Sequence, residues 1–184
     1  MLKIVNAPNK VLSQQAKPIE KIDKAIHKLI KDMEKTLIIA KDPEGVGLAA
    51  PQVEVSLQLF LVKQTSKSPT LVFINPKIEE YIDDEPEQKE KEDKEKGVQL
   101  EGCLSLQDIW GVVKRSHSVV LSYQDETGKD HKRKFSGFIA TIIQHEVDHL
   151  SGFLFTKRVL EQKNPLYNCK KYENGEVEYE KIEL

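Results

Sequence analysis

Residues 144–152 read QHEVDHLSG and contain the pattern His-Glu-x-x-His. On a helix this spacing stacks the imidazoles of His145 and His149 on one face, where both can reach one cation at about 2.0–2.1 Å. Glu146 follows the first histidine and would lie beside the ion, where a carboxylate can handle the protons of a water. The stretch predicts a helical metal site, and the alternative is two ordinary histidines that flank a solvated glutamate.

A catalytic metal also needs a third protein ligand and an open position for water. Phe155 stands where one group of zinc proteases carries a third histidine, and the remaining histidines fall in a predicted helix or in alternating strands. Cys103 remains, in the polar, glycine-containing turn LEGCLSLQ at 100–107. A lone cysteine is commonly a small buried hydrophobe, but a thiolate in such a turn is a good metal ligand. We therefore predict Cys103, His145 and His149 as the ligands.

The hydrophobic pattern around this stretch predicts the fold class. Residues 137–150 have the pattern of one helix, and residues 19–38 that of a long amphipathic helix with a charged outer face. Predicted strands occupy 57–63, 71–78, 111–124 and 130–135. This order of elements predicts a single α+β domain over residues 1–184, with antiparallel strands packed around the central metal-binding helix and a long N-terminal helix.

Charge is concentrated in one segment of the chain. Residues 83–96 carry eight acidic residues and four lysines, so the formal charge of −2 leaves a nearly neutral remainder. Such a remainder gives no indication of binding to nucleic acid or to an anionic membrane. We interpret 83–96 as a solvated, flexible, charged insertion and 163–184 as a polar C-terminal tail.

Cysteine content and the N-terminal sequence bear on the compartment. The two cysteines, Cys103 and Cys169, are too few for a disulfide framework. The N-terminal residues MLKIVNAPNK contain no apolar run of secretory length, and no window approaches a membrane span. We expect a reduced protein of the bacterial cytoplasm, without a signal or transit peptide.

Three separated motifs occur along the sequence: GVGLAAPQ at 45–52, EGCLS at 101–105 and QHEVDHLSG at 144–152. In these motifs and in their order the sequence resembles the peptide deformylases. The resemblance implies hydrolysis of the N-formyl group of formylmethionyl peptides or nascent chains, with release of formate. The alternatives are an endopeptidase built on the same helix, which needs a ligand downstream of His149, and a non-catalytic relative that binds peptide N-termini.

By matching position, the resemblance implies roles for the residues of the second and third motifs. Cys103, His145 and His149 would hold one divalent ion per chain, natively Fe²⁺, with Zn²⁺, Ni²⁺ or Co²⁺ as other occupants. Glu146 would act as general base and general acid.

The resemblance also implies residues that contact the substrate or support the site. Gln52 and the backbone N–H of Leu104 would bind the oxyanion, where negative charge develops during attack. Glu101 and Arg115 would form a charge pair that steadies the second motif. The implied substrate-binding residues are Gly45, Val46, Gly47, Gly102, Phe138, Thr141 and Ile142.

The sequence departs from the family pattern near the implied pocket. Trp110 stands where members often carry Arg, and Thr141 stands where they often carry Ile or Arg. These departures leave the peptide preference beyond Met open. The tail 163–184 is not the basic helix that some relatives use to dock on ribosomes, so we do not extend ribosome docking to this chain.

Overall fold

A computed structural model describes residues 1–41, 44–83, 100–172 and 174–183 of the chain. Residues 84–96 of the charged segment, which the sequence analysis interprets as an insertion, lie outside the described residues. Within the described ranges, the chain forms two antiparallel sheets, three α-helices and two short 3-10 helices. The α+β class predicted from the sequence is confirmed.

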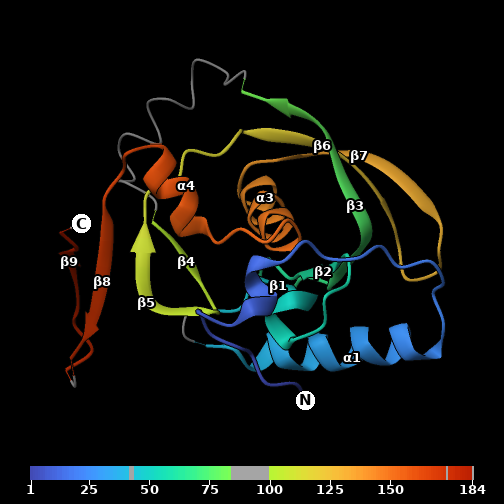
Figure 1. The fold of residues 1–184 in the computed structure, drawn as a ribbon, viewed down its shortest axis with the longest axis horizontal. Helices are drawn as coiled ribbons and strands as arrows, with labels where there is room; N and C mark the ends of the chain where they lie inside the picture. Colours follow the sequence, from blue (N-terminus) through green and yellow to red (C-terminus); the bar gives the residue numbers. More distant parts are fainter. Residues whose placement is uncertain (42–43, 84–99, 173, 184) are drawn as a thin grey trace.

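Helix α3 (Phe138–Leu150) lies at the centre of the molecule, and the larger sheet curves around it (Figure 1). Phe60, Phe73 and Leu121 of this sheet are buried and pack in one cluster with Ile143 of α3. Burial of this apolar surface holds α3 against the sheet. The sheet has the order β1 (Gly47–Ala49), β2 (Leu59–Val62), β3 (Leu71–Ile82), β6 (Ser118–Gln124) and β7 (Asp130–Ser136).

Helix α1 (Lys24–Ile39) packs its apolar face against strands β1 and β2 (Figure 1). Met33 and Leu37 on this face are buried in one cluster with Leu48 and Leu61 of the two strands. The opposite face of the helix carries charged residues, as the sequence pattern predicts.

The first turn of α1 is set by a capping residue. The sequence predicts a helix from residue 19, but the helix begins at Lys24 because the Asp23 carboxylate accepts hydrogen bonds from the backbone N–H groups of Ala25 at 2.8 Å and Ile26 at 3.1 Å. Ile19, which the helical pattern included, instead lies in the extended segment before the cap and is buried in the same core cluster.

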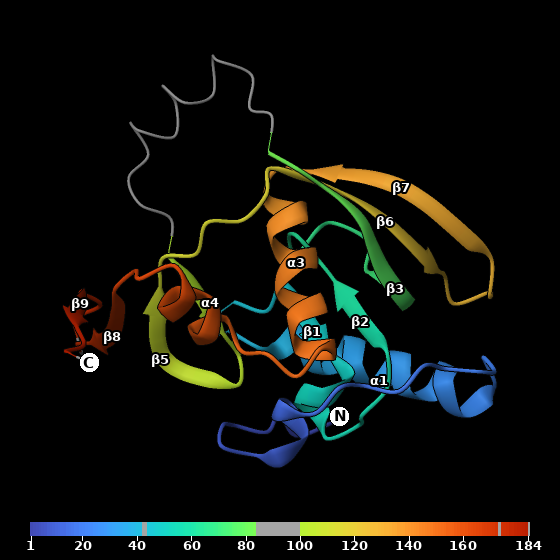
Figure 2. The ribbon, with the colours of Figure 1, turned by 45° about the horizontal axis from the view of Figure 1, so that its top comes forward.

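The smaller sheet lies on the other side of the molecule, next to helix α4 (Phe155–Glu161) (Figure 2). Phe155 and Val159 of α4 pack with Leu166 of the sheet in a separate small core. Gly111 makes room for this contact, because a Cβ there would lie 2.7 Å from a methyl group of Val159. The sheet has the order β4 (Glu101–Cys103), β5 (Leu106–Gly111), β8 (Leu166–Lys171) and β9 (Val177–Lys181).

Most of the strands that the sequence pattern does not predict lie in the smaller sheet. The sequence predicts one strand over 111–124, whereas β5 ends at Gly111 and β6 begins at Ser118, and these two strands belong to different sheets. Strands β8 and β9 form a hairpin within the segment interpreted as a polar tail. Every residue of β9 is exposed, so no apolar alternation marks it as a strand.

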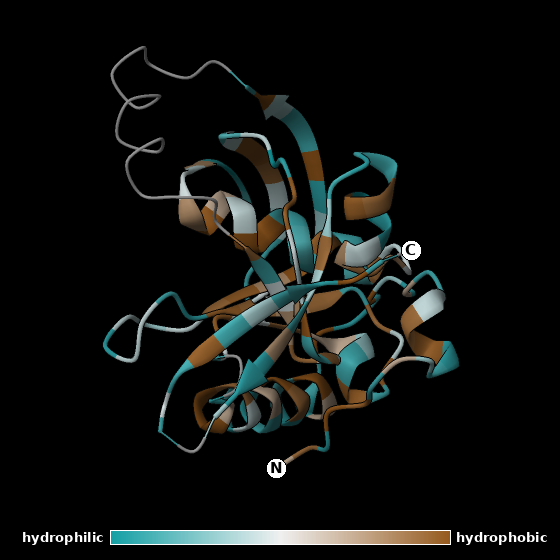
Figure 3. Cartoon of the chain, turned by 90° about the vertical axis from the view of Figure 1, so that its left-hand side faces the viewer, coloured by the Kyte–Doolittle hydropathy of each residue, from teal (hydrophilic) through white to brown (hydrophobic). Residues whose placement is uncertain are grey.

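The distribution of hydropathy agrees with this layered arrangement. Figure 3 shows bands of hydrophobic and hydrophilic residues along most helices and strands, which is the pattern of elements with one buried face. Among the described residues, no helix combines the length and the apolar character that crossing a membrane requires.

Replacing Asp23 with Ala tests the cap of α1. We expect the free energy of unfolding to fall by about 1 kcal/mol, because loss of an N-cap side chain costs about 0.5–2 kcal/mol. Urea unfolding followed by circular dichroism measures the change. The Asp23→Asn variant keeps an acceptor oxygen and should lose much less. Equal losses in the two variants would contradict capping as the cause.

Candidate active site

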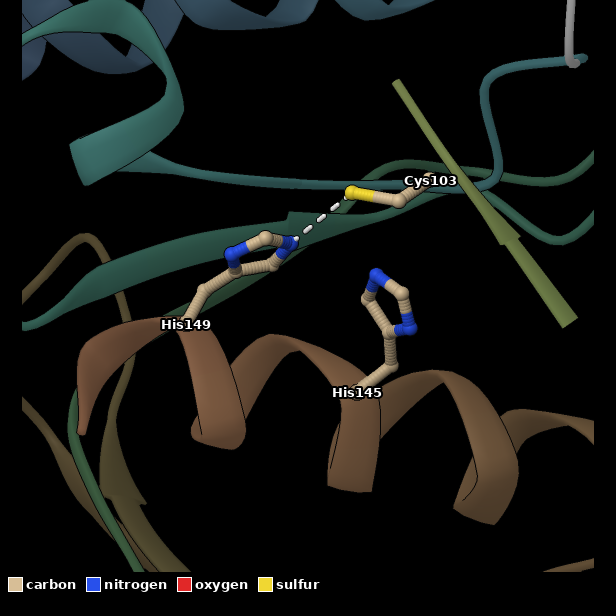
Figure 4. A group of neighbouring side chains, drawn as sticks. All are labelled: Cys103, His145 and His149. Atoms are coloured by element: carbon tan, nitrogen blue, oxygen red, sulfur yellow. Dashed lines mark hydrogen bonds between the residues drawn. The ribbon is translucent and has the colours of Figure 1, made fainter. Parts of the chain in front are cut away.

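The three predicted metal ligands lie together in the structure (Figure 4). His145 and His149 project from the same face of α3, and Cys103 faces them from the end of β4. The sulfur of Cys103 lies 3.2 Å from Nε2 of His149, and the ligand atoms of all three residues lie within 4.8 Å of one another. All three residues are buried.

The turn after β4 directs the thiol of Cys103 toward the histidines. Strands β4 and β5 form a hairpin with a register shift between Gly102 and Cys103, so that Cys103 pairs with Leu106. Within this turn the backbone N–H of Ser105 donates to the sulfur at 3.4 Å. This hydrogen bond fixes the direction of the sulfur within the turn, where it can serve as a metal ligand.

Glu101 holds the ring of His145 in a defined orientation. Nδ1 of His145 lies 2.6 Å from Oε1 of Glu101, so Nδ1 carries the proton and Nε2 is left to face a metal. Arg115 donates to the same carboxylate at 3.1 Å from Nε and 2.7 Å from Nη2. Burial opposes ionisation of Glu101, but His145 and Arg115 outweigh it and lower its pKa to about 2.

Asp148 extends this charge network from the metal ligands toward the surface. Its carboxylate accepts hydrogen bonds from Nη1 of Arg115 at 2.6 Å and from Nη2 of Arg158, on α4, at 2.7 Å. Neither Asp148 nor Arg158 was predicted as a site residue. Asp148 occupies a position that the His-Glu-x-x-His pattern leaves unspecified, and nothing in the spacing relates it to either arginine.

Glu146 lies beside the metal ligands with one carboxylate oxygen unpaired. Its side chain is buried, and no hydrogen-bond partner for Oε2 occurs among the described residues. The other oxygen lies against Gly47, where a Cβ would come within 2.2 Å of it, so only glycine leaves room for the carboxylate. Burial raises the pKa of Glu146 to about 7, which suits a group that takes up and releases a proton near neutral pH.

Gln52 presents its amide group to the thiol of Cys103. It lies in the 3-10 helix η2 (Ala50–Val53) and is buried. The backbone N–H of Ala49 donates to Oε1 at 2.8 Å, which identifies Oε1 as the acceptor end of the amide. Nε2 therefore points toward the sulfur of Cys103, 3.6 Å away, and toward Oγ of Ser105, 3.3 Å away.

A cavity of about 560 Å³ opens above Glu146 and His145, a volume in the range of small-ligand sites. Gly45 is not among the residues that line it. This glycine packs against the end of α1, where a Cβ would lie 2.5 Å from the carbonyl oxygen of Leu37, and its role as a substrate contact stays a prediction. The implied binding residues that do line the cavity are Val46, Gly47, Gly102, Phe138, Thr141 and Ile142, together with Gln52 and Leu104.

Some residues of the cavity wall were not predicted to bind substrate. Trp110, Lys114 and Gln64 all line it. Of these three, only Trp110 stands out in the sequence, as a departure from the family pattern. They come from strand ends and connecting segments outside the three motifs, so motif spacing gives no signal for them.

The residues of the site fit a divalent metal ion. One thiol and two imidazoles form a donor set used by Zn²⁺ and by other first-row metals. Burial lowers the pKa of His149 well below its usual value, so its ring stays neutral, which is the form that ligates. Three protein ligands leave an open position on a four-coordinate ion.

A buried Cys-His-His set with an unpaired carboxylate, at the inner end of a cavity, defines a metal-dependent hydrolase. The model of the polypeptide deformylase family matches residues 1–165 of the sequence. The chain belongs to this family, and its activity is that of a peptide deformylase.

Individual relatives agree with the family match. Peptide deformylase 1 of Bacillus cereus is 39% identical over 161 residues, which cover 86% of this chain and 92% of that protein. The solved peptide deformylase of Thermotoga maritima is 33% identical with a TM-score of 0.73, covering 86% of this chain and 97% of that one. The peptide deformylase of Synechococcus elongatus in complex with actinonin is 36% identical with a TM-score of 0.73, covering 85% of this chain and 79% of that one.

Replacing Arg115 with Met tests the buried charge network. The side chain of Arg115 is only 8% exposed, and its loss leaves the carboxylates of Glu101 and Asp148 without their shared partner. We expect the free energy of unfolding to fall by about 3–5 kcal/mol, the cost of breaking a buried ion pair on one side. Urea unfolding measures the loss.

The matched control for this test is Arg133→Met. Arg133 is an exposed residue of β7 whose guanidinium lies 5.9 Å from the ring centre of Phe135. This substitution should change the free energy of unfolding by less than about 1 kcal/mol. A loss of similar size in both variants would show that the buried network contributes nothing beyond an ordinary arginine side chain.

Proposed function

We propose that the protein removes the formyl group from the N-terminal formylmethionine of newly made polypeptides and releases formate. The observation that supports this most is the unpaired oxygen of Glu146 next to Cys103, His145 and His149, at the inner end of a cavity. Metal-dependent hydrolysis of an amide uses metal ligands, a group that carries protons and a space for the acyl group, and all three lie together here.

Glu146 is the proton carrier in this proposal. Its carboxylate takes a proton from the attacking water and delivers it to the amine nitrogen that departs when the carbon–nitrogen bond breaks. Gly47 supports this role because it leaves the carboxylate in place without a competing side chain. The pKa near 7 supports it as well, since both proton transfers then occur without a large free-energy penalty.

Gln52 and the backbone N–H of Leu104 are the proposed oxyanion donors. Attack on the formyl carbon places negative charge on its oxygen, and a preorganised donor to such an oxygen is worth about 2.7–4 kcal/mol. The hydrogen bond from Ala49 supports the assignment of Gln52, because it holds the NH₂ end of the amide toward the metal ligands before substrate arrives.

The apolar part of the cavity is the proposed place for the methionine side chain. Val46, Phe138 and Ile142 offer an apolar wall, and Thr141 lies on the same side, on α3. A flexible thioether adapts well to such a surface. The backbone at Gly47 and Gly102 can approach an extended peptide closely, because neither residue carries a side chain.

One divalent ion per chain is the proposed cofactor, held by Cys103, His145 and His149. When bound, such an ion polarises a carbonyl oxygen and lowers the pKa of water. We propose Fe²⁺ as the native ion, with Zn²⁺, Ni²⁺ and Co²⁺ as possible occupants, because a thiolate with two imidazoles accepts all of them.

The residues around the site weigh against the two other functions considered from the sequence. An endopeptidase of the related zinc group would need a ligand near Phe155, but this ring is buried and stacks on His145 with centroids 6.1 Å apart. A protein that only binds peptide N-termini has no use for the buried, unpaired Glu146. We retain formylmethionyl peptides or nascent chains as the partner, with no nucleic-acid or membrane partner, and the cytoplasm as the compartment; ribosome docking is not part of the proposal.

Replacing Glu146 with Gln tests the assignment of the proton carrier. We expect formate release from formyl-Met-Ala-Ser to fall by about 10²–10⁴-fold, the usual contribution of general acid–base catalysis. Metal content should be unchanged, because the three ligands remain. Glu126→Gln, in the exposed turn before β7, is the control and should keep full activity. Retained turnover in the Glu146 variant would remove this residue from the mechanism.

Exposure to air tests the identity of the metal. Protein purified without oxygen should lose activity in air and recover it with Fe²⁺ and a reductant, whereas protein loaded with Zn²⁺ should keep its activity, because zinc has no redox chemistry. Elemental analysis should find about one iron per chain in active preparations. Air-stable activity with one zinc per chain would contradict the proposal for iron.

A further inference from the structure

Trp110 covers a glycine next to the metal ligand Cys103. Gly102 and Trp110 are directly opposed in the β4–β5 ladder, and β4 is the edge strand of its sheet. A Cβ on Gly102 would lie 2.9 Å from Cζ3, 3.0 Å from Cε3 and 3.1 Å from Cδ2 of Trp110, so the indole ring lies flat against the glycine backbone. Aromatic residues stabilise glycines of β-strands in this way. The same indole lines the cavity.

A second ring, from the C-terminal hairpin, fixes the position of this indole. Tyr179 on β9 makes an edge contact with Trp110, with ring centroids 6.0 Å apart and planes at 82°. This geometry is one of the two favourable arrangements of aromatic pairs. Strand β8 connects the two rings, because Tyr167 pairs with Trp110 on one side and with Lys181 on the other, and Tyr179 precedes Lys181 by two residues on the same face.

The hairpin that carries Tyr179 lies outside the residues that the family model matches. The family match ends at residue 165, whereas β8 begins at Leu166. A wall of the cavity is therefore held in place by an element beyond the matched region. The three motifs and the metal ligands all lie within it.

We propose that Trp110 is a specificity-determining residue that favours an apolar or aromatic side chain after the formylmethionine, and that Tyr179 is a positioning residue that acts through it. This proposal rests on the deformylase function proposed above. The indole offers a flat apolar surface over Gly102, the residue next to Cys103 on β4, and neighbouring residues of a strand are about 3.4 Å apart. An extended peptide has a similar rise per residue. If its formyl group lies at the metal ligands, the side chains that follow the formylmethionine therefore reach the indole.

Competition between substrates tests the proposal in the metal-loaded protein. The measured quantity is the ratio of kcat/KM for formyl-Met-Phe-Ser, or formyl-Met-Ala-Phe, to that for formyl-Met-Ala-Ser. We expect the larger of the two ratios to exceed one in the wild type. In Trp110→Ala this ratio should fall by about threefold to tenfold, which is the range that loss of an aromatic contact predicts. Trp110→Phe should give an intermediate ratio.

Substitutions in the hairpin separate positioning from general stability. Tyr179→Ala should lower the same ratio by at least about twofold, and Tyr179→Phe should restore it, because the contact depends on the ring. Tyr172→Ala is the matched control: Tyr172 lies in the same hairpin, is 48% exposed against 43% for Tyr179, and its hydroxyl bonds Glu178. This control should leave the ratio and the turnover of formyl-Met-Ala-Ser unchanged.

Fluorescence gives a readout that does not need turnover. Trp110 is the only tryptophan of the chain, so its emission reports directly on the proposed contact. Addition of the product peptide Met-Phe-Ser or Met-Ala-Phe should shift the emission more, and at lower concentration, than Met-Ala-Ser does. Tyr179→Ala should reduce this difference, and Tyr172→Ala should preserve it.

The outcomes distinguish this proposal from the proposed function. Absence of formate release from formyl-Met-Ala-Ser would defeat the deformylase function, while the fluorescence difference between peptides would still support the role of Trp110. Turnover with no preference for Phe-containing peptides in the wild type would overturn the role of Trp110 alone. An unchanged ratio in Tyr179→Ala, or an equal loss in Tyr172→Ala, would overturn the positioning role of Tyr179.

Discussion

One buried carboxylate, that of Glu101, joins the parts of the molecule that must meet at the metal ligands. It accepts a hydrogen bond from His145 of α3 and pairs with Arg115 from the segment before β6. Cys103 follows Glu101 by two residues on the same short strand, so the contacts that hold Glu101 also hold the thiol. A sulfur and two imidazoles from distant parts of the chain can share one ion only if strand and helix keep a fixed separation. Glu101 provides that constraint.

The network around Glu101 is better explained by orientation than by stability. Buried ion pairs lose much of their attraction to desolvation, and apolar residues of similar volume often stabilise a protein equally well. An apolar residue in place of Glu101 could not accept a hydrogen bond from the Nδ1–H group of His145, and the ring would then lose its defined tautomer. Asp148 and Arg158 extend this network. Asp148 pairs with the buried charge of Arg115, and Arg158 in turn pairs with Asp148, so neither buried charge lacks a partner.

The sequence predicts the two long helices of this protein better than its short or exposed strands, for physical reasons. Helix α3 and the ligands on it follow from strict spacing, since one turn of helix leaves only one way to place His145 and His149 on a shared face. The long helix α1 follows from its apolar periodicity, although its start depends on a single capping side chain. The short strand β4 carries Cys103 but has too few residues to show a pattern, and β9 has no buried face. Long-range pairs such as Arg115 with Asp148 depend on tertiary packing, which no local signal records.

Two glycines of the motifs explain how the cavity wall can change while the metal ligands stay in place. Gly47 leaves space for Glu146, and Gly102 leaves space for Trp110, so in each case the backbone of one element makes room for a side chain of another. The two spaces differ in what they require. The space at Gly47 holds the carboxylate of Glu146 beside the metal ligands, where the proposed mechanism uses it. The space at Gly102 requires only a side chain that covers the strand. The indole of Trp110, held by the neighbouring hairpin, covers it here, and the long side chain of an arginine could also do so. Residue 110 can therefore change its chemistry, and with it the surface that a peptide meets, while Glu101 and Cys103 on either side of Gly102 remain in place.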